Sequence, residues 1–380
     1  MSATLDGPEL ARLVRRVFAP GPQDDALAIM VDLPDERLPD NPEWRQRRAL
    51  AAGWAAALAA RPEEAGLRRV SLVWYRNAGG NNADLPPACV PARPGEGIPA
   101  SAAALADRPQ LPFAELFATH RLILAPTELS ATAPLKVAAR TALFRAATMP
   151  GFTPAMVPAL RLDYGEVNRR VSLLKELLDA AQGAEVVLRT GATRHLLRLD
   201  LRHRQAHASG GLIHEPGTAG NLPSGEAYIV PYEGELPGDP SGTAGELPVQ
   251  FGNEIVRYAI AGNRAVAVLS SGPHSDAERA LIAREPAYAN LAELGLGVLA
   301  DFGLVPVDSL LLDEKLGLHL AFGRSDHFGG QVGPSAFSGP GAVVHIDRVY
   351  LPQTQPLIAV ETVSLGGRVL MREGRYTDVF

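Results

Sequence analysis

The stretch Val343-Val344-His345-Ile346-Asp347 carries the clearest pair of chemically competent side chains in this sequence. Successive side chains of a β-strand point to opposite faces, so His345 and Asp347 would share one face and Val344 and Ile346 the other. An imidazole beside a carboxylate is a recurrent arrangement for chelating a metal ion. The pair therefore predicts a metal site, and a hydrogen-bonded structural pair is the alternative.

Three further residues could take part in such chemistry. Glu226 follows a turn rich in Pro, Ser and Gly, which would place it at the mouth of a strand over residues 227–230. Glu293 is a single carboxylate among small and apolar residues, and burying it is costly unless it is paired or binds a metal. His319 lies between two leucines, and strand alternation would send its imidazole to the opposite face. The alternatives are exposed acids for the two glutamates and a structural role for His319.

The candidate residues lie in the more acidic half of the chain. The 380 residues have a formal net charge of -6, yet residues 201–380 alone hold 12 Lys and Arg against 20 Asp and Glu, with seven of the nine histidines. A net negative charge disfavours nucleic acid and anionic membranes as partners. Cys89 is the only cysteine, which excludes an intrachain disulfide and a cysteine-rich metal site and fits a cytoplasmic protein. The first 20 residues lack the apolar core of a signal peptide, and no membrane-spanning stretch follows.

Positioning these residues requires a scaffold, for which the sequence predicts two domains. Short apolar runs alternate with Ala- and Leu-rich helical segments, which indicates a Rossmann-like α/β domain with a doubly wound, mostly parallel sheet over residues 1–164. A helix over 164–182 has one apolar stripe and ends before Gly183. Short strands follow, so we expect an α+β domain over residues 165–380 that carries the metal site. The expected strands are 26–31, 70–75, 121–125, 184–189, 196–201, 227–230, 265–269, 343–347 and 357–363.

Common catalytic motifs are missing from the sequence. It contains no GxxxxGK[ST] loop, no GxGxxG after a strand, no GxSxG elbow and no HExxH. The α/β domain therefore carries no nucleotide signature, and any chemistry must be assembled from dispersed residues. The Asn-, Gly- and Pro-rich segment 76–112 is expected to be a surface loop, with a lid or a dimer contact as alternatives.

Four ordered motifs together resemble a metallopeptidase family. The series NLPSGE (221–226), AELGLG (292–297), LHLAFG (318–323) and HID (345–347) is similar to the family of aminopeptidase T and aminopeptidase S, over about residues 160–350. The resemblance implies a homodimer in which two divalent ions, Zn, Co or Mn, activate a water that releases N-terminal residues from short peptides. It also places Glu226 among the catalytic residues. The ligands that it implies are Glu226, Glu293, His319, His345 and Asp347.

The sequence departs from this family at one position. The family has a tyrosine a few residues after the histidine that matches His319, where this chain reads Arg324-Ser325-Asp326-His327-Phe328. Asp326 or His327 could supply a general acid, a proton shuttle or a sixth ligand in its place. Arg324 and the following glycine turn could instead bind a substrate carboxylate.

A second enzyme class has to be considered, because the superfamily also resembles 2,5-dihydroxypyridine 5,6-dioxygenase. That chemistry needs one Fe(II) on a triad of two histidines and one carboxylate, which His319, His345 and Asp347 could form. Glu293 stands where we expect that subgroup to have histidine, so the donor set favours two redox-inert ions and a hydrolase. A protein that has lost catalysis and serves binding or assembly is the third interpretation.

Overall fold

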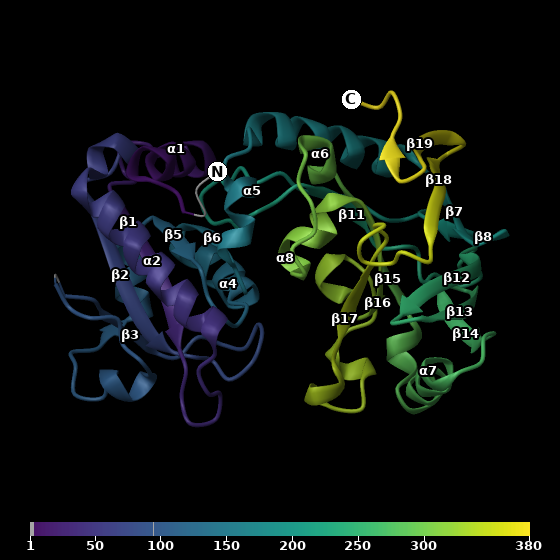
Figure 1. Ribbon diagram of the computed structural model, residues 1–380, viewed down its shortest axis with the longest axis horizontal. Coiled ribbons are helices and arrows are strands. Elements are labelled where there is room, and N and C mark those ends of the chain that lie inside the picture. The colour runs from purple at the N-terminus through teal and green to yellow at the C-terminus, as the bar shows by residue number, and fades with distance from the viewer. Residues whose placement is uncertain (1–3, 94) are drawn as a thin grey trace. The chain divides into compact units, whose positions relative to one another are not determined.

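The computed structural model describes residues 4–93 and 95–380, which form two compact units. One unit comprises the chain up to Val167 together with residues 211–224, and the other comprises residues 168–210 and 225–380. The first is an α/β domain and the second is built on antiparallel sheets (Figure 1). No helix within the described residues is both long and apolar enough to cross a bilayer.

A seven-stranded sheet in the order β10-β6-β5-β1-β2-β3-β4 forms the centre of the first unit. The first five strands in that order are parallel, whereas β3 and β4 are antiparallel to their neighbours. All eight residues of β1 are buried, as is typical of a parallel strand with helices on both faces. The strands are β1 (Ala26–Leu33), β2 (Arg69–Arg76), β3 (Ala88–Pro91), β4 (Leu111–Pro112), β5 (Leu122–Ala125), β6 (Arg145–Thr148) and β10 (Ala219–Asn221).

Helices complete the core of this unit. Phe113 and Phe117 from α3 and Leu135 from α4 pack with Met30 of β1 and Ile123 of β5 in one buried cluster. The other helices include α2, which packs against β1 and β2. The helices are α1 (Gly7–Phe18), α2 (Pro42–Ala60), α3 (Phe113–Thr119), α4 (Thr132–Ala142) and α5 (Val157–Leu160).

Two segments of this unit differ from the sequence predictions. The segment 76–112, expected to be a surface loop, contains β3 and β4, which extend the sheet beyond β2. Residues 211–224, expected in the second domain, pack with the first unit because β10 pairs in parallel with β6. A three-residue strand such as β10 carries too little pattern to reveal its partner in the sequence.

The second unit contains two antiparallel sheets. Five strands follow the order β17-β16-β15-β11-β9, and eight follow the order β14-β13-β12-β8-β7-β18-β19-β20. The strands are β7 (Gly183–Thr190), β8 (Thr193–Asp200), β9 (His207–Ser209), β11 (Glu226–Ile229), β12 (Ala244–Phe251), β13 (Glu254–Ala261), β14 (Arg264–Val268), β15 (Leu291–Gly297), β16 (Leu318–Gly323), β17 (His345–Val349), β18 (Ala359–Leu365), β19 (Arg368–Arg372) and β20 (Arg375–Tyr376). Its helices are α7 (Pro273–Arg284), α8 (Leu310–Asp313) and α6 (Tyr164–Ala180), of which the residues up to Val167 belong to the first unit.

Helix α6 confirms the predicted apolar stripe, because the side chains at 167, 171, 174, 178 and 181 are all buried. β15 was not predicted as a strand, yet all seven of its residues are buried between β11 and β16. This central strand places Glu293 in the interior of the five-stranded sheet.

Candidate metal centre

The five ligands expected from the sequence lie on one face of the five-stranded sheet, where β11, β15, β16 and β17 run side by side (Figure 1). Glu293 pairs with Ala321, which pairs with Asp347, and directly paired residues of antiparallel strands project to the same face. His345 and His319 follow at two-residue intervals on the same face of their strands. Glu226 begins β11 and is paired with Gly297 of β15. All five residues belong to the second unit.

Glu293 is shared by two groups of potential ligands. It joins Glu226 and His319 in one triad, and His345 and Asp347 in the other, with the donor atoms of each triad within 4.8 Å of one another. Its Oε1 lies 3.1 Å from His319 Nε2, and its Oε2 lies 3.2 Å from His345 Nε2. A carboxylate with one oxygen toward each triad is suited to bridging two cations.

Glu226 and Asp347 each belong to one triad only, and each lies at a similar distance from the histidine of its triad. Glu226 Oε2 lies 3.5 Å from His319 Nε2, and Asp347 Oδ1 lies 3.5 Å from His345 Nε2. Glu226 Oε2 is buried and has no hydrogen-bond partner among the described residues. Leaving a buried carboxylate oxygen unsatisfied is costly, so this oxygen indicates a place for a cation. The oxygen and imidazole donors fit divalent ions such as Zn, Mn or Fe(II).

Backbone carbonyl oxygens orient both imidazoles through contacts with their Nδ1 atoms. His345 Nδ1 lies 2.7 Å from the carbonyl oxygen of Arg324, and His319 Nδ1 lies 3.4 Å from that of Gly317. Because a carbonyl oxygen only accepts, Nδ1 of His345 carries a proton, and Nε2 is left to face the carboxylates. Such contacts fix the tautomer and the ring orientation of metal-binding histidines.

Two glycines of β15 make room for this arrangement. A Cβ at Gly295 would lie 1.8 Å from His319 Nε2, so the imidazole occupies the space where a side chain would be. A Cβ at Gly297 would lie 2.2 Å from the backbone of Lys315. The AELGLG motif therefore combines one ligand with two positions that must lack a side chain.

Lys315 is a charged member of the site that the sequence analysis missed. Its side chain is 1% exposed, and its ammonium donates to Glu226 Oε1 at 2.5 Å and also to Glu314. The contact leaves only Oε2 of Glu226 free to face His319. The residue precedes β16 in a short helical turn, where neither hydrophobic pattern nor spacing distinguishes it from an exposed lysine.

In the metal-free site, interactions between the acidic and histidine side chains affect their pKa values more than burial does. Burial opposes protonation of His319, but its contact with Glu293 and the charge of Glu226 outweigh burial and raise its pKa to about 9. His345 likewise has a raised pKa, because Asp347 and Glu293 outweigh its burial. Burial raises the pKa of Glu293, but its two histidine partners lower it overall. The acids therefore hold charge that protons or metal ions must balance, and an incoming metal ion would displace the imidazole protons.

Asp326 and His327, the expected replacements for the family tyrosine, lie beside the two triads and belong to neither. Asp326 is ion-paired with Arg324 at 2.5 Å. The His327 ring lies edge-to-face with His345 at 5.3 Å between centroids. Burial, together with the charges of His345 and Arg324, lowers the pKa of His327 to about 4, so its ring is neutral at pH 7. A neutral imidazole can both donate and accept a hydrogen bond.

Tyr228 is a second residue that the sequence analysis missed. It lies two residues after Glu226 on β11, and therefore on the same face of the sheet. Burial and the charges of Glu293 and Glu226 raise its pKa, which keeps the phenol protonated. Strand alternation could have identified it once Glu226 was placed in a strand.

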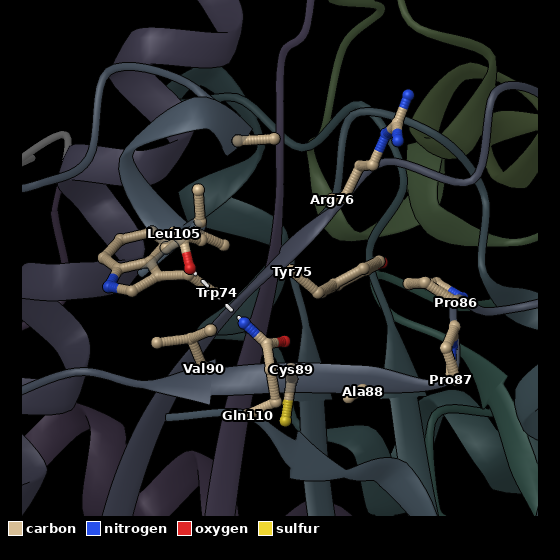
Figure 2. A pocket seen from close by; sticks show the side chains of 12 residues that line it. Trp74, Tyr75, Arg76, Pro86, Pro87, Ala88, Cys89, Val90, Leu105 and Gln110 are labelled. Carbon is tan, nitrogen blue, oxygen red and sulfur yellow. Dashed lines mark hydrogen bonds between the residues drawn. The ribbon is translucent and has the colours of Figure 1, made fainter. Parts of the chain in front are cut away.

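Cys89 takes no part in this centre. It lines a cavity of about 210 Å³ in the first unit, next to Trp74, Tyr75 and Gln110, whose amide donates to the carbonyl of Leu105 (Figure 2). Burial raises the pKa of the Cys89 thiol to about 12, which makes it unreactive at neutral pH. The cavity is smaller than most small-molecule sites, which span about 300–1,000 Å³.

No family model and no curated protein matches the sequence, but solved structures match over almost the full length. 2,5-Dihydroxypyridine dioxygenase from Pseudomonas putida KT2440 aligns with a TM-score of 0.60 and 14% identity, over 98% of this chain and 98% of that chain. Wild-type AmpT from Thermus thermophilus aligns with a TM-score of 0.54 and 16% identity, over 97% of this chain and 99% of that chain. The chain has the fold of these two enzymes. The expected resemblance is therefore confirmed in three dimensions, and both neighbours are enzymes.

Proposed function

We propose that this protein is a metal-dependent hydrolase, most simply an aminopeptidase that releases N-terminal residues from short peptides. The observation that carries the proposal is Glu293, which directs one carboxylate oxygen to each of two triads. A single-ion site has no need for a carboxylate shared in this way. The fold similarity to AmpT supports the same assignment.

Each residue of the centre has a part in this proposal. Glu226, Glu293 and His319 would hold one ion, and Glu293, His345 and Asp347 the other. Two divalent ions there would polarise the scissile carbonyl and lower the pKa of a water molecule. The carbonyl contacts behind the imidazoles keep each Nε2 directed at its triad.

The neighbouring residues supply orientation and proton transfer. Lys315 holds Glu226 Oε1, so this carboxylate offers its other oxygen in a fixed direction. His327, whose ring contacts that of His345, would take a proton from the attacking water and return it to the leaving amine, once metal binding has removed the charge on His345 that lowers the pKa of His327.

Metal counting and a substrate panel test the proposal. Protein stripped with chelator and reloaded with Zn, Co or Mn should bind close to two ions per chain and hydrolyse aminoacyl anilides. His345→Ala should lose metal while keeping its fold by circular dichroism, since the imidazole is the only group removed. His274→Ala is the matched control, because His274 lies on α7, outside both triads. Full metal content in His345→Ala would show that the ligands are wrongly assigned.

One observation favours a second candidate, an Fe(II)-dependent ring-cleaving dioxygenase. The ammonium of Lys315 already balances one charge of Glu226, while Glu293 lies 3.1 Å from His319 Nε2 and 3.2 Å from His345 Nε2, so two imidazoles and one carboxylate would be left to hold a single ion. The fold similarity to 2,5-dihydroxypyridine dioxygenase supports the same alternative. One iron per chain, with oxygen uptake on a dihydroxypyridine and no release of amino acids, would replace the hydrolase by this activity.

The partners follow from the same resemblance. We propose a cytoplasmic homodimer that acts on a small peptide or another small molecule. Light scattering coupled to gel filtration gives the mass directly, and a mass of one chain would remove the dimer from the proposal.

A further inference from the structure

A row of paired residues crosses the five-stranded sheet beside the two triads. His207 of β9 pairs with Tyr228 of β11, Tyr228 pairs with Gly295 of β15, and Gly295 pairs with His319 of β16. Directly paired residues of antiparallel strands project to the same face. The row therefore lies on the face that carries the candidate metal centre.

Gly295 lies between Tyr228 and His319 in this row and has no side chain. The imidazole of His319 lies over Gly295, as the 1.8 Å approach of a Cβ to Nε2 shows, so the position paired with Tyr228 carries no side chain of its own. Two strand spacings amount to about 9.6 Å, a gap that a tyrosine and a histidine side chain can close from either side. Tyr228 is thus the next side chain along this row after His319 of the first triad.

The ring of Tyr228 is clamped, while its hydroxyl is free. The ring stacks on His207 with centroids 5.2 Å apart and meets Phe328 edge-to-face at 4.8 Å. His207 is itself held, because its Nε2 lies 3.0 Å from the carbonyl oxygen of Phe328. No hydrogen-bond partner of the Tyr228 hydroxyl is found within residues 4–93 and 95–380. The aromatic contacts hold the ring in place, and the hydroxyl remains available as a hydrogen-bond donor.

We propose that Tyr228 is a substrate-binding and catalytic residue, whose phenolic O–H donates a hydrogen bond to the substrate oxygen on which negative charge develops. This inference rests on the proposed function, in which that oxygen belongs to the scissile carbonyl. The phenol keeps its proton throughout and stabilises charge by hydrogen bonding alone. A donor fixed before the reaction contributes most when it meets charge that develops only in the transition state.

Tyr228→Phe tests this assignment, since it removes the hydroxyl and retains the clamped ring. We expect wild-type metal content, an unchanged Co(II) absorption spectrum and an unchanged melting temperature. Loss of one such donor lowers kcat by about 100-fold, with KM nearly constant. The affinity for an amino-acid phosphonate, which mimics the tetrahedral state, should fall in parallel, while the affinity for the free amino acid stays constant.

Tyr258→Phe is the matched control. Tyr258 is a buried tyrosine of β13 whose hydroxyl donates to Glu278 and whose ring packs on Phe322 of β16, which projects to the face opposite to His319. Its loss should lower the melting temperature and leave kcat and phosphonate affinity unchanged.

Binding calorimetry can distinguish a failure of this inference from a failure of the proposed function. The affinities of wild type and Tyr228→Phe are measured for two probes, the phosphonate and 2,5-dihydroxypyridine. If wild type binds only the dihydroxypyridine, the hydrolase is refuted, and a tenfold weaker affinity of Tyr228→Phe for that ring still supports the donor. Equal affinity of both proteins for the bound probe overturns the inference alone. Loss of metal from Tyr228→Phe also overturns it, because the tyrosine would then support the ligands. If wild type binds neither probe, both proposals fall.

Discussion

Lys315→Met is the most informative perturbation of this centre, because it removes one charge from the interior and keeps the length of the side chain. The wild-type side chain is 1% exposed, and its ammonium contacts both Glu226 and Glu314. Removing one partner of a buried ion pair costs about 3–5 kcal/mol, since the remaining charge is left uncompensated. Burial already raises the pKa of Glu314 to about 7, so protonation of this acid relieves part of the cost. We therefore expect a loss near 3 kcal/mol at pH 7 in metal-free protein.

A divalent ion should restore much of this stability, because it binds beside the same Glu226. An ion present at 100 times its Kd stabilises the folded protein by about 2.7 kcal/mol. The assay is urea unfolding of wild type and Lys315→Met, each in chelator and in excess Zn or Mn, which gives four free energies of unfolding. Metal should stabilise the variant more than the wild type, since the ion no longer competes with the ammonium.

The matched control for this experiment is Lys175→Met. Lys175 makes an exposed ion pair with Asp179 one turn further along α6, so its replacement should change stability by less than about 0.5 kcal/mol. Two results would refute the reasoning. One is a metal-free Lys315→Met protein within about 1 kcal/mol of wild type. The other is an equal effect of metal on both proteins, which would mean that the ion and the ammonium do not share Glu226.

Three further predictions concern other parts of the molecule. Gly295→Ala should lower metal affinity at least tenfold by calorimetry, because its Cβ would displace His319; Gly53→Ala, where the Cβ meets nothing within 4 Å, should have no effect. His327→Ala should lower kcat by about 100-fold with full metal content if this imidazole relays a proton, and an equal loss of metal would instead make it a ligand. Burial and the charge of a nearby arginine lower the pKa of His120, so folding favours its neutral ring. The neutral ring contributes to the free energy of unfolding above about pH 6.5, and this contribution is lost as the pH falls below that value, by at most about 1.4 kcal/mol per pH unit. In urea unfolding, His120→Gln should therefore show a smaller loss of stability with falling pH. An unchanged dependence of the unfolding free energy on pH would contradict this prediction.

The sequence predicted those parts of the centre that follow strand alternation. His345 and Asp347 share one face of β17, and His319 projects away from its flanking leucines, as their spacing requires. Glu226 begins a strand, as the preceding turn indicated. For each of these residues, local pattern and tertiary structure agree.

The remaining features depend on neighbours that no local pattern describes. β15 contains two glycines, which weaken any strand signal, and they are present because His319 and the backbone of Lys315 occupy the space of their side chains. The role of Tyr228 depends on the register of three strands. Residues 211–224 belong to the first unit only because β10 pairs with β6.

The Nδ1 contacts of the two imidazoles have a consequence for the choice of metal. They join each ring to backbone that is itself held within the sheet or next to it, so neither ring can swing to meet an ion of different size. Glu293 is equally constrained, because β15 has a hydrogen-bonded strand on both sides. A centre built in this way discriminates between ions by radius and preferred geometry more than by the charge they carry. Titrations with a series of divalent ions should therefore deviate from the usual order of increasing affinity from Mn to Cu.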